Sequence, residues 1–332
     1  MTNHSDWQVT RCNVALFDRL VPLAISLRGY KVTHVDQGVV CGSWVNEKDD
    51  VIPPNASLQW RERVVVFWIH GGGYITGSNL GYGTDRCYVM DRFKKHSPFA
   101  TKPLLFFSVE YPRCPEISVL EIRNVVVANY RWLTEVVGAK NVVIAGDSAG
   151  GNMSLLLHQY LTEQQSRDGL SVTLPKALVL VSPWVDLTST ATTDCIEQQN
   201  ALANSDFIQQ PAIDLFRSQL RLTNEEQDRL SPVFFHPSST FAMPQHGVLV
   251  LYGSAEFLKC EIEKWIERVK STLKKSKNDS KFVVVCAKDM PHDYPNILFD
   301  FGWSKSRKLV KEALDRFANV CVEISESAKL GK

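Results

Sequence analysis

The stretch from Val142 to Tyr160 decides the fold. It begins Val142-Val143-Ile144-Ala145-Gly146-Asp147-Ser148-Ala149-Gly150 and continues to Tyr160 with helical spacing. A short β-branched apolar run, typical of a buried strand, therefore meets a helix at the pattern G-x-S-x-G. Such a serine lies on a tight turn, and the glycines two residues before and after it leave space where a Cβ would collide. The turn exposes the hydroxyl and the helix points its positive end at it, so Ser148 is the candidate nucleophile.

Similar apolar runs recur along the chain, each bounded by polar or glycine-rich segments. They are Val64–His70, Leu104–Val109, Val142–Gly146, Ala177–Ser182, Val248–Gly253 and Phe282–Ala287. Their length and composition predict strands that are buried on both faces. Helical patterns over Val119–Leu133, Ala149–Tyr160, Glu261–Leu273 and Ser306–Val320 separate them. This alternation predicts an α/β protein with a mostly parallel central sheet flanked by helices.

Two regions break the alternation and predict the domain organisation. We expect residues 1–49 to form an N-terminal cap segment, residues 50–186 and 246–332 the core, and residues 187–245 a helical cap insertion. Within the first region, Val14 to Leu27 has the spacing of an amphipathic helix. Two alternatives stay open for this helix, which would either cover a pocket or lie on a membrane surface.

A second motif, His70-Gly71-Gly72-Gly73-Tyr74, follows the first apolar run. Three consecutive glycines suit a backbone that brings its N–H groups close to a ligand, and they are a poor choice for a regular strand. We assign oxyanion-binding N–H groups to Gly71 and Gly72, with Ala149 as the third donor. A phosphate-binding P-loop is excluded because no Lys-Ser/Thr pair follows.

A serine hydroxyl needs a base and an acid that orients it. Among the eight histidines, His292 follows the last apolar run, at the sheet edge where open α/β sheets place their chemistry. His158 lies about three turns into the helix after Ser148 and points away from it. Glu256 follows the run that ends at Gly253 and lies between the serine and the histidine in chain order. We therefore predict His292 as the base and Glu256 as the acid.

Composition limits the class of protein. The chain has 332 residues and a formal net charge of +1, and 44% of its residues are hydrophobic, which excludes an intrinsically disordered chain. The sequence has no basic cluster of the kind that would predict nucleic acid binding. Its longest apolar runs are far shorter than the ~20 residues of an integral membrane segment. The eight cysteines are scattered with no CxxC pair, which predicts reduced thiols, a buried Cys286 and a cytoplasmic location. Association with a membrane surface and secretion both stay open as alternatives.

Together these residues resemble the hormone-sensitive-lipase-like family of α/β-hydrolases, over most of the chain after Val64. The matching segments are His70–Tyr74, Val109–Glu116, Gly146–Asn152, Ser182–Asp186 (SPWVD), Gly253–Leu258 and His292. Glu256 stands where most members have aspartate, and Pro112 and Cys114 depart from the family's V-D-Y-R-L-A-P-E pattern. The resemblance implies a serine hydrolase with a cap and with no metal or cofactor. Gly253–Leu258 is also similar to fungal members, some of which deacetylate sterol esters.

These observations predict an enzyme that hydrolyses small to medium lipophilic carboxylic esters through an acyl-enzyme. Tyr74, Trp184 and Phe207 are the candidate substrate-binding side chains. An amide or formamide hydrolase with the same three residues is an alternative, and a non-catalytic small-molecule receptor is an alternative of another class. The acyl-chain length, the alcohol and the oligomeric state are not determined by the sequence.

Overall fold

A computed structural model describes residues 20–81, 83–97, 102–168, 172–188, 193–202, 205–234, 242–276, 281–301 and 306–330. The strands are β1 (Tyr30–Gln37), β2 (Val40–Glu47), β3 (Val64–Ile69), β4 (Leu105–Val109), β5 (Asn141–Asp147), β6 (Ala177–Val181), β7 (Val248–Gly253) and β8 (Phe282–Ala287). The helices are α2 (Gly83–His96), α3 (Val119–Arg131), α4 (Ala149–Asp168), α5 (Thr193–Ala201), α6 (Gln210–Leu220), α7 (Asn224–Leu230), α8 (Lys259–Ser276), α9 (Tyr294–Phe301) and α10 (Arg307–Lys329). Short helical turns are η1 (Leu58–Arg61), η2 (Trp132–Val137) and η3 (Pro232–Phe234), and residues 20–27 form a further helix.

The strands form one sheet in the order β1-β2-β4-β3-β5-β6-β7-β8. The pairs β1–β2 and β2–β4 are antiparallel, and every other neighbouring pair is parallel. The carboxyl ends of β5, β6, β7 and β8 therefore lie side by side at one edge. Loops that leave this edge place their side chains within reach of one another, as in other open parallel sheets.

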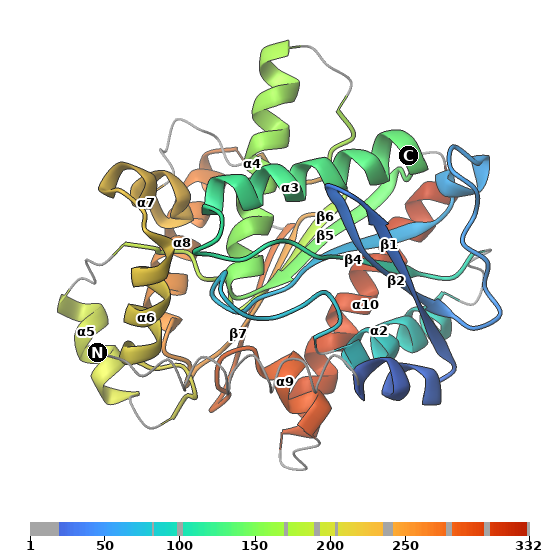
Figure 1. Cartoon of the computed structure of the whole chain (residues 1–332). Coiled ribbons are helices and arrows are strands. Elements are labelled where there is room, and N and C mark those ends of the chain that lie inside the picture. Colours follow the sequence, from blue (N-terminus) through green and yellow to red (C-terminus); the bar gives the residue numbers. More distant parts are fainter. Residues whose placement is uncertain are drawn as a thin grey trace.

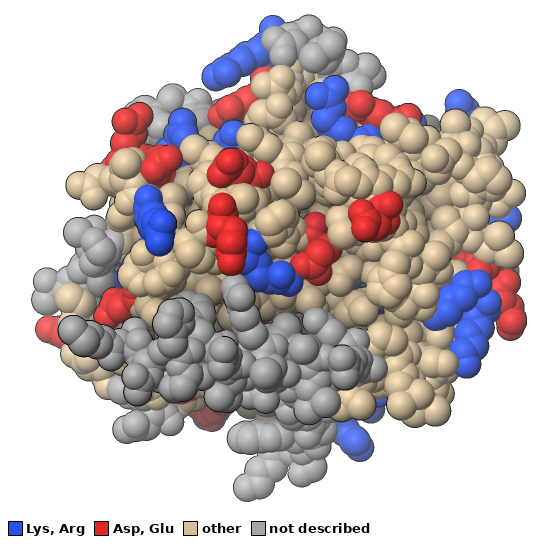
Figure 2. Space-filling view, viewed as in Figure 1, with Lys and Arg blue, Asp and Glu red and all other residues tan. Residues whose placement is uncertain are grey.

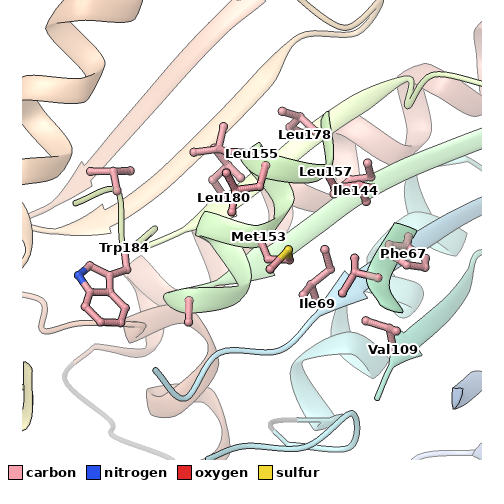
Figure 3. Close-up of a cluster of buried hydrophobic side chains, with 14 of the residues drawn as sticks. Phe67, Ile69, Val109, Ile144, Met153, Leu155, Leu157, Leu178, Leu180 and Trp184 are labelled. Carbon is pink, nitrogen blue, oxygen red and sulfur yellow. The ribbon is translucent and has the colours of Figure 1, made fainter. Parts of the chain in front are cut away.

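Helices cover both faces of the sheet (Figure 1), and β3 shows why its sequence is apolar throughout. Val65, Phe67 and Ile69 point into one hydrophobic cluster with α3, α4 and α8, whereas Val64, Val66 and Trp68 point into a second cluster with α2 and α10. Alternate side chains of a strand face opposite sides, so a strand between two helical layers needs apolar residues at every position. Figure 3 shows part of the first cluster, where Met153, Leu155 and Leu157 of α4 pack with side chains from β3, β5 and β6.

The structure confirms the predicted α/β class and corrects the prediction at both ends of the sheet. Residues 30–47, which we expected to belong to an N-terminal cap, form the antiparallel strands β1 and β2 of the central sheet. At the other end, β8 has a neighbour on one side only, and Cys286 is exposed where we predicted a buried thiol. The side chains of an edge strand are more exposed than those of a central strand. A local apolar run does not show whether it will form an edge strand or a central one.

The predicted cap insertion, residues 187–245, carries α5, α6 and α7 between β6 and β7. These helices lie together at one side of the sheet in Figure 1. A disulfide joins Cys195 of α5 to Cys260 of α8, with 5.4 Å between the two Cα atoms. The prediction that the cysteines are reduced is therefore wrong for this pair, which lies 65 residues apart in the sequence.

Two further observations concern the surface. On the face shown in Figure 2, coloured Lys and Arg side chains are scattered among Asp and Glu and form no continuous basic patch. Across the described ranges of the chain, no helix is long and apolar enough to cross a membrane. Of the predicted helix over Val14–Leu27, residues 14–19 lie outside the described part, and Val21 and Ile25 pack into the second cluster.

Candidate active site

Ser148 lies where β5 turns into α4, in the strained conformation that the motif predicts. Its φ is +51°, in the left-handed region that non-glycine residues rarely adopt. Its N–H donates to the Val181 carbonyl at 2.9 Å, which fixes the turn against β6. A Cβ on Gly146 would lie 2.5 Å from the Gly150 carbonyl oxygen, and a Cβ on Gly150 would overlap the Ile69 carbonyl oxygen. The turn therefore closes only because these two positions lack a side chain.

The glycine loop after β3 lies against this turn, but one of its N–H groups has a different partner from the one we expected. The Gly71 N–H donates to Asp147 Oδ1 at 3.0 Å, so it is not free to bind an oxyanion. Among the described residues, no hydrogen bond engages the N–H of Gly72 or Gly73. Both have positive φ, +105° and +62°, which turns the chain sharply and suits glycine. The assignment of Gly71 as a donor is corrected, and Gly72 and Gly73 are the free amides of this loop.

Neighbouring residues hold the glycine loop rigid. The His70 ring stacks on Tyr111 with centroids 4.0 Å apart, and the Tyr111 hydroxyl donates to the His70 carbonyl at 2.5 Å. Burial lowers the pKa of His70 to about 3, so this ring is neutral and takes no part as a cation. Arg113 pairs with Glu110 at 2.7 Å and also donates to the Gly77 carbonyl. The segment that departs from the family pattern thus still supports the loop.

Glu256 and His292 lie side by side, as predicted. Both side chains are fully buried, and Glu256 Oε1 lies 3.7 Å from His292 Nδ1. The other carboxylate oxygen of Glu256 accepts the Gly253 N–H at 2.8 Å and the Ser182 hydroxyl at 2.7 Å. These two donors hold the carboxylate with Oε1 directed at the imidazole. A carboxylate at Nδ1 orients a catalytic imidazole and stabilises its protonated form.

The opposite nitrogen of the imidazole faces another carboxylate. His292 Nε2 lies 3.4 Å from Asp293 Oδ2, and within the described chain neither ring nitrogen has a hydrogen-bond partner. The Asp293 N–H donates to the Ser182 hydroxyl at 3.0 Å, so Ser182 links the acid loop to the base loop. Ser182 itself has a positive φ of +42°, and the predicted S-P-W-x-D motif is the signal that marks it. Hydrogen bonds of a catalytic group are often incomplete before substrate binds.

Buried carboxylates surround His292, the predicted base, and act on its charge. Burial by itself would lower the pKa of His292, but the carboxylates of Asp293, Glu256 and Asp206 outweigh it and raise the pKa to about 10. Burial raises the pKa of Asp293 well above its usual value, against the positive charge of His292. A single imidazole thus lies among several carboxyl groups whose negative charge favours its protonated form.

Asp147 connects the base electrostatically to the nucleophile turn. Burial raises its pKa to about 6, against the Gly71 N–H and the charges of Arg86 and His292, which favour the carboxylate. Because Asp147 precedes Ser148 and feels the charge of His292, the nucleophile turn and the base loop share one electrostatic environment. This agrees with the neighbouring carboxyl ends of β5 to β8.

Of the three predicted substrate-binding aromatics, only Phe207 is accessible. Phe207 is 56% exposed, and its ring centroid lies 5.9 Å from that of His292. Trp184 is buried in the first hydrophobic cluster, and Tyr74 is buried with its hydroxyl donating to Asn152 at 2.5 Å. Tyr74 and Trp184 therefore hold α4 and the following loops in place and are not walls of an open pocket in this structure.

One functional candidate escaped the sequence analysis. Asp206, in the predicted cap, is 7% exposed and accepts the backbone N–H of Phe257 at 2.7 Å and that of His292 at 3.2 Å. No local pattern around Asp206 signals this role, because its two partners lie 51 and 86 residues away in the sequence.

Comparisons with known proteins show the family of the chain and its similarity to several esterases. The model of a family described as having the α/β hydrolase fold matches residues 66–296. An "Esterase" of Acinetobacter venetianus is 30% identical over 128 residues, which is 38% of this chain and 37% of the relative. A "Putative acetyl-hydrolase LipR" of Mycobacterium tuberculosis is 29% identical over 169 residues, 51% of this chain and 48% of the relative. A "Steryl acetyl hydrolase 1" of Saccharomyces cerevisiae is 29% identical over 128 residues, 38% of this chain and 27% of the relative. The matches thus span less than half the length of these relatives.

Solved structures support the fold over nearly the whole chain. The crystal structure of the hormone-sensitive-lipase homologue EstE7, from a metagenome library, superposes with a TM-score of 0.65 at 21% identity, covering 98% of this chain and 99% of that one. Carboxyl esterase 2 of the fungus Tuber melanosporum gives a TM-score of 0.65 at 17% identity, covering 88% of this chain and 85% of that one. With the family match over residues 66–296, these findings confirm the predicted fold: the chain belongs to the family with the α/β hydrolase fold, and it is similar in structure to a hormone-sensitive-lipase homologue.

Proposed function

We propose that this chain is a serine hydrolase that cleaves carboxylic esters of small to medium lipophilic substrates through an acyl-enzyme. The observation that carries the proposal is the buried pair of Glu256 and His292, 3.7 Å apart, at the sheet edge where Ser148 occupies a strained strand-to-helix turn. A nucleophile, a base and an acid in this chain order are the parts that acyl transfer needs.

In the proposed reaction, His292 accepts the Ser148 proton while the hydroxyl oxygen attacks the ester carbonyl. Glu256 stabilises the imidazolium, which then protonates the leaving alcohol. The alcohol departs, and the acyl group stays bonded to Ser148 as an acyl-enzyme. His292 next activates a water that hydrolyses this intermediate. The imidazolium formed from the water proton then protonates Ser148 Oγ as the acyl group leaves as the carboxylic acid. Acylation and deacylation each return the imidazole to its neutral state, so no external proton carrier is required.

The oxyanion would be bound by the N–H groups of Gly72, Gly73 and Ala149. Supporting this, the Gly72 and Gly73 amides have no partner among the described residues, whereas Gly71 is held by Asp147. Ala149 is the first residue of α4, where backbone N–H groups lack partners within the helix. One such donor contributes about 3 to 4 kcal/mol of transition-state stabilisation.

The names of two relatives suggest an acetyl group as the first acyl group to test, since one is an acetyl-hydrolase and another a steryl acetyl hydrolase. The accessible ring of Phe207 beside the imidazole supports a lipophilic substrate. We therefore propose acetyl esters of lipophilic alcohols as the substrate class.

The test is hydrolysis of p-nitrophenyl acetate, butyrate and octanoate by wild type, Ser148→Ala and His292→Ala, with an aryl formamide assayed in parallel. We expect either substitution to lower kcat about 10³-fold or more. Because His292 must be neutral to act and its pKa is raised, kcat/KM should rise with pH along a limb centred above the ordinary histidine value of about 6.5.

Three outcomes would contradict the proposal. Unchanged ester hydrolysis in Ser148→Ala would remove the assigned nucleophile. Absence of both turnover and fluorophosphonate labelling in wild type would favour a non-catalytic receptor, and turnover of the formamide alone would favour the amide hydrolase.

A further inference from the structure

Three consecutive residues of the predicted cap contact both loops that carry the acid and the base. We call Ser205, Asp206 and Phe207 the cap clasp. Asp206 Oδ2 accepts the Phe257 N–H at 2.7 Å and Oδ1 accepts the His292 N–H at 3.2 Å. One carboxylate thus bridges the residue that follows the acid and the backbone of the base itself.

The flanking residues add contacts on either side of this bridge. The Ser205 hydroxyl donates to the Ala255 carbonyl at 3.0 Å, so the clasp bonds the residues immediately before and after Glu256. The Phe207 ring lies beside the imidazole, with centroids 5.9 Å apart and the ring planes tilted by 60°. The cap is therefore joined to the acid–base pair through polar and aromatic contacts together.

The strand side of the same loops is held separately. The Ser254 N–H donates to the Ala287 carbonyl at 2.8 Å, the Ala255 N–H donates to the Met290 carbonyl at 3.0 Å, and the Asp289 N–H donates to the Ser254 hydroxyl at 2.8 Å. These bonds leave the cap-facing N–H groups of Phe257 and His292 to Asp206. A carboxylate accepts N–H hydrogen bonds more strongly than a neutral acceptor does. By accepting from both residues, Asp206 sets the separation between the backbones of Phe257 and His292.

We propose that Asp206 is a positioning residue, which holds Glu256 and His292 at their working separation from the cap side. The inference rests on the proposed function and adds that the cap takes part in aligning the catalytic pair as well as covering the site. A misplacement of about 1 Å in a catalytic group typically lowers the rate about 100-fold, so a clasp of this kind should act on kcat.

Asp206 also contributes charge to the site. Carboxyl groups reach His292 from four directions: Asp147 at the end of β5, Glu256 after β7, Asp293 beside the ring, and Asp206 from the cap. Asp206→Asn removes one negative charge and one of the two acceptors with little change of shape. We therefore expect the acid limb of kcat/KM to move to lower pH in this variant, because the imidazolium loses an opposite charge.

The experiment compares wild type with Asp206→Asn, Asp206→Ala and Ser205→Ala on p-nitrophenyl acetate, at the pH plateau and across the pH profile. We expect Asp206→Asn to lower plateau kcat about tenfold and Asp206→Ala by up to about 100-fold, with smaller effects on KM. Ser205→Ala, which loses a single bond, should lower kcat less. The control is Asp214→Asn on α6, an exposed aspartate of the predicted cap that accepts a hydrogen bond from Gln210. It should leave kcat and the pH profile unchanged.

A purely structural role is distinguished by expressing rates per folded molecule, with the folded fraction taken from thermal unfolding. If Asp206→Asn lowers the unfolding temperature but keeps the wild-type kcat and the wild-type acid limb, the inference is overturned. Labelling of Ser148 by a fluorophosphonate would in that case still uphold the proposed function. If wild type neither turns over esters nor reacts with a fluorophosphonate, the proposed function fails and this inference fails with it.

Discussion

At the scale of single residues, buried carboxyl groups distinguish this molecule. Asp147, Glu256, Glu261 and Asp293 all have low exposure, yet each serves a different purpose. The first holds the glycine loop and the second faces the base, whereas Glu261 lies beneath the predicted cap. A buried carboxyl group is tolerated only where hydrogen bonds or charges compensate, and burial raises the pKa values of Asp147, Glu261 and Asp293.

Glu261 yields a prediction about stability and pH. Burial, with the nearby charge of Asp186, raises its pKa to about 8 from 4.5, although Arg217 lies 3.9 Å away and Gln199 donates at 3.4 Å. A raised pKa means that the folded state holds the proton more tightly. The resulting stability is fully present below pH 4.5 and is lost as the pH rises through about 8, by at most about 1.4 kcal/mol per pH unit.

The measurement is the free energy of unfolding of wild type and Glu261→Gln by urea between pH 5 and 9. The neutral glutamine should flatten the decline and make the variant the more stable protein at pH 9. Glu312→Gln, at an exposed site on α10, should follow the wild-type slope. Parallel curves for wild type and Glu261→Gln would contradict the prediction.

At the scale of elements, the β1–β2 hairpin extends the sheet and completes its hydrophobic core. Trp44 of β2 is 3% exposed, with ring centroids 4.9 Å from Phe107, 5.6 Å from Trp60 and 6.3 Å from Trp132. These aromatic contacts bind the hairpin to β4 and to the turns on either side. The hairpin therefore belongs to the folding unit and is not a detachable cover.

This assignment predicts that Trp44→Ala costs about 3 to 5 kcal/mol of unfolding free energy, the usual cost of removing a large buried aromatic side chain. The acyl-chain preference of the remaining folded enzyme should stay that of wild type. Val39→Ala is the control, since Val39 lies in the same hairpin but is 61% exposed and should cost little. A changed ester preference with unchanged stability would instead indicate that the hairpin acts as a cap.

At the scale of the whole molecule, the Cys195–Cys260 disulfide joins the predicted cap to the core a few residues beyond Glu256. The predicted cytoplasmic location relied on reduced cysteines, and this bond removes that argument because disulfides persist chiefly in oxidising compartments. The bond also restricts the unfolded chain. Closing a loop of 65 residues corresponds to a stabilisation of about 4 kcal/mol in the chain-entropy description.

The paired substitution Cys195→Ala with Cys260→Ala should therefore lower the free energy of unfolding by up to about 4 kcal/mol under non-reducing conditions. Cys286→Ala, at an exposed free cysteine, is the control and should have little effect. Alkylation followed by peptide mass spectrometry should label Cys195 and Cys260 only after reduction. Labelling of both without a reductant would show that the bond is not formed.

The sequence by itself determined the parts whose signals are local. The six strands β3 to β8, the helices α3, α4, α8 and α10, and the turn around Ser148 all follow from short patterns, because strand and helix periodicity and turn chemistry depend on neighbouring residues. The predicted bounds of β7 and β8 agree with the structure at both ends.

Only the tertiary structure decided which of those residues meet. It directs the Gly71 N–H to Asp147 across 76 residues, joins Cys195 to Cys260, and brings Asp206 to the backbone of His292. It also buries Tyr74 and leaves Phe207 exposed. Such contacts depend on how distant elements pack around one sheet, and a local pattern carries no information about the partner that a side chain finds there.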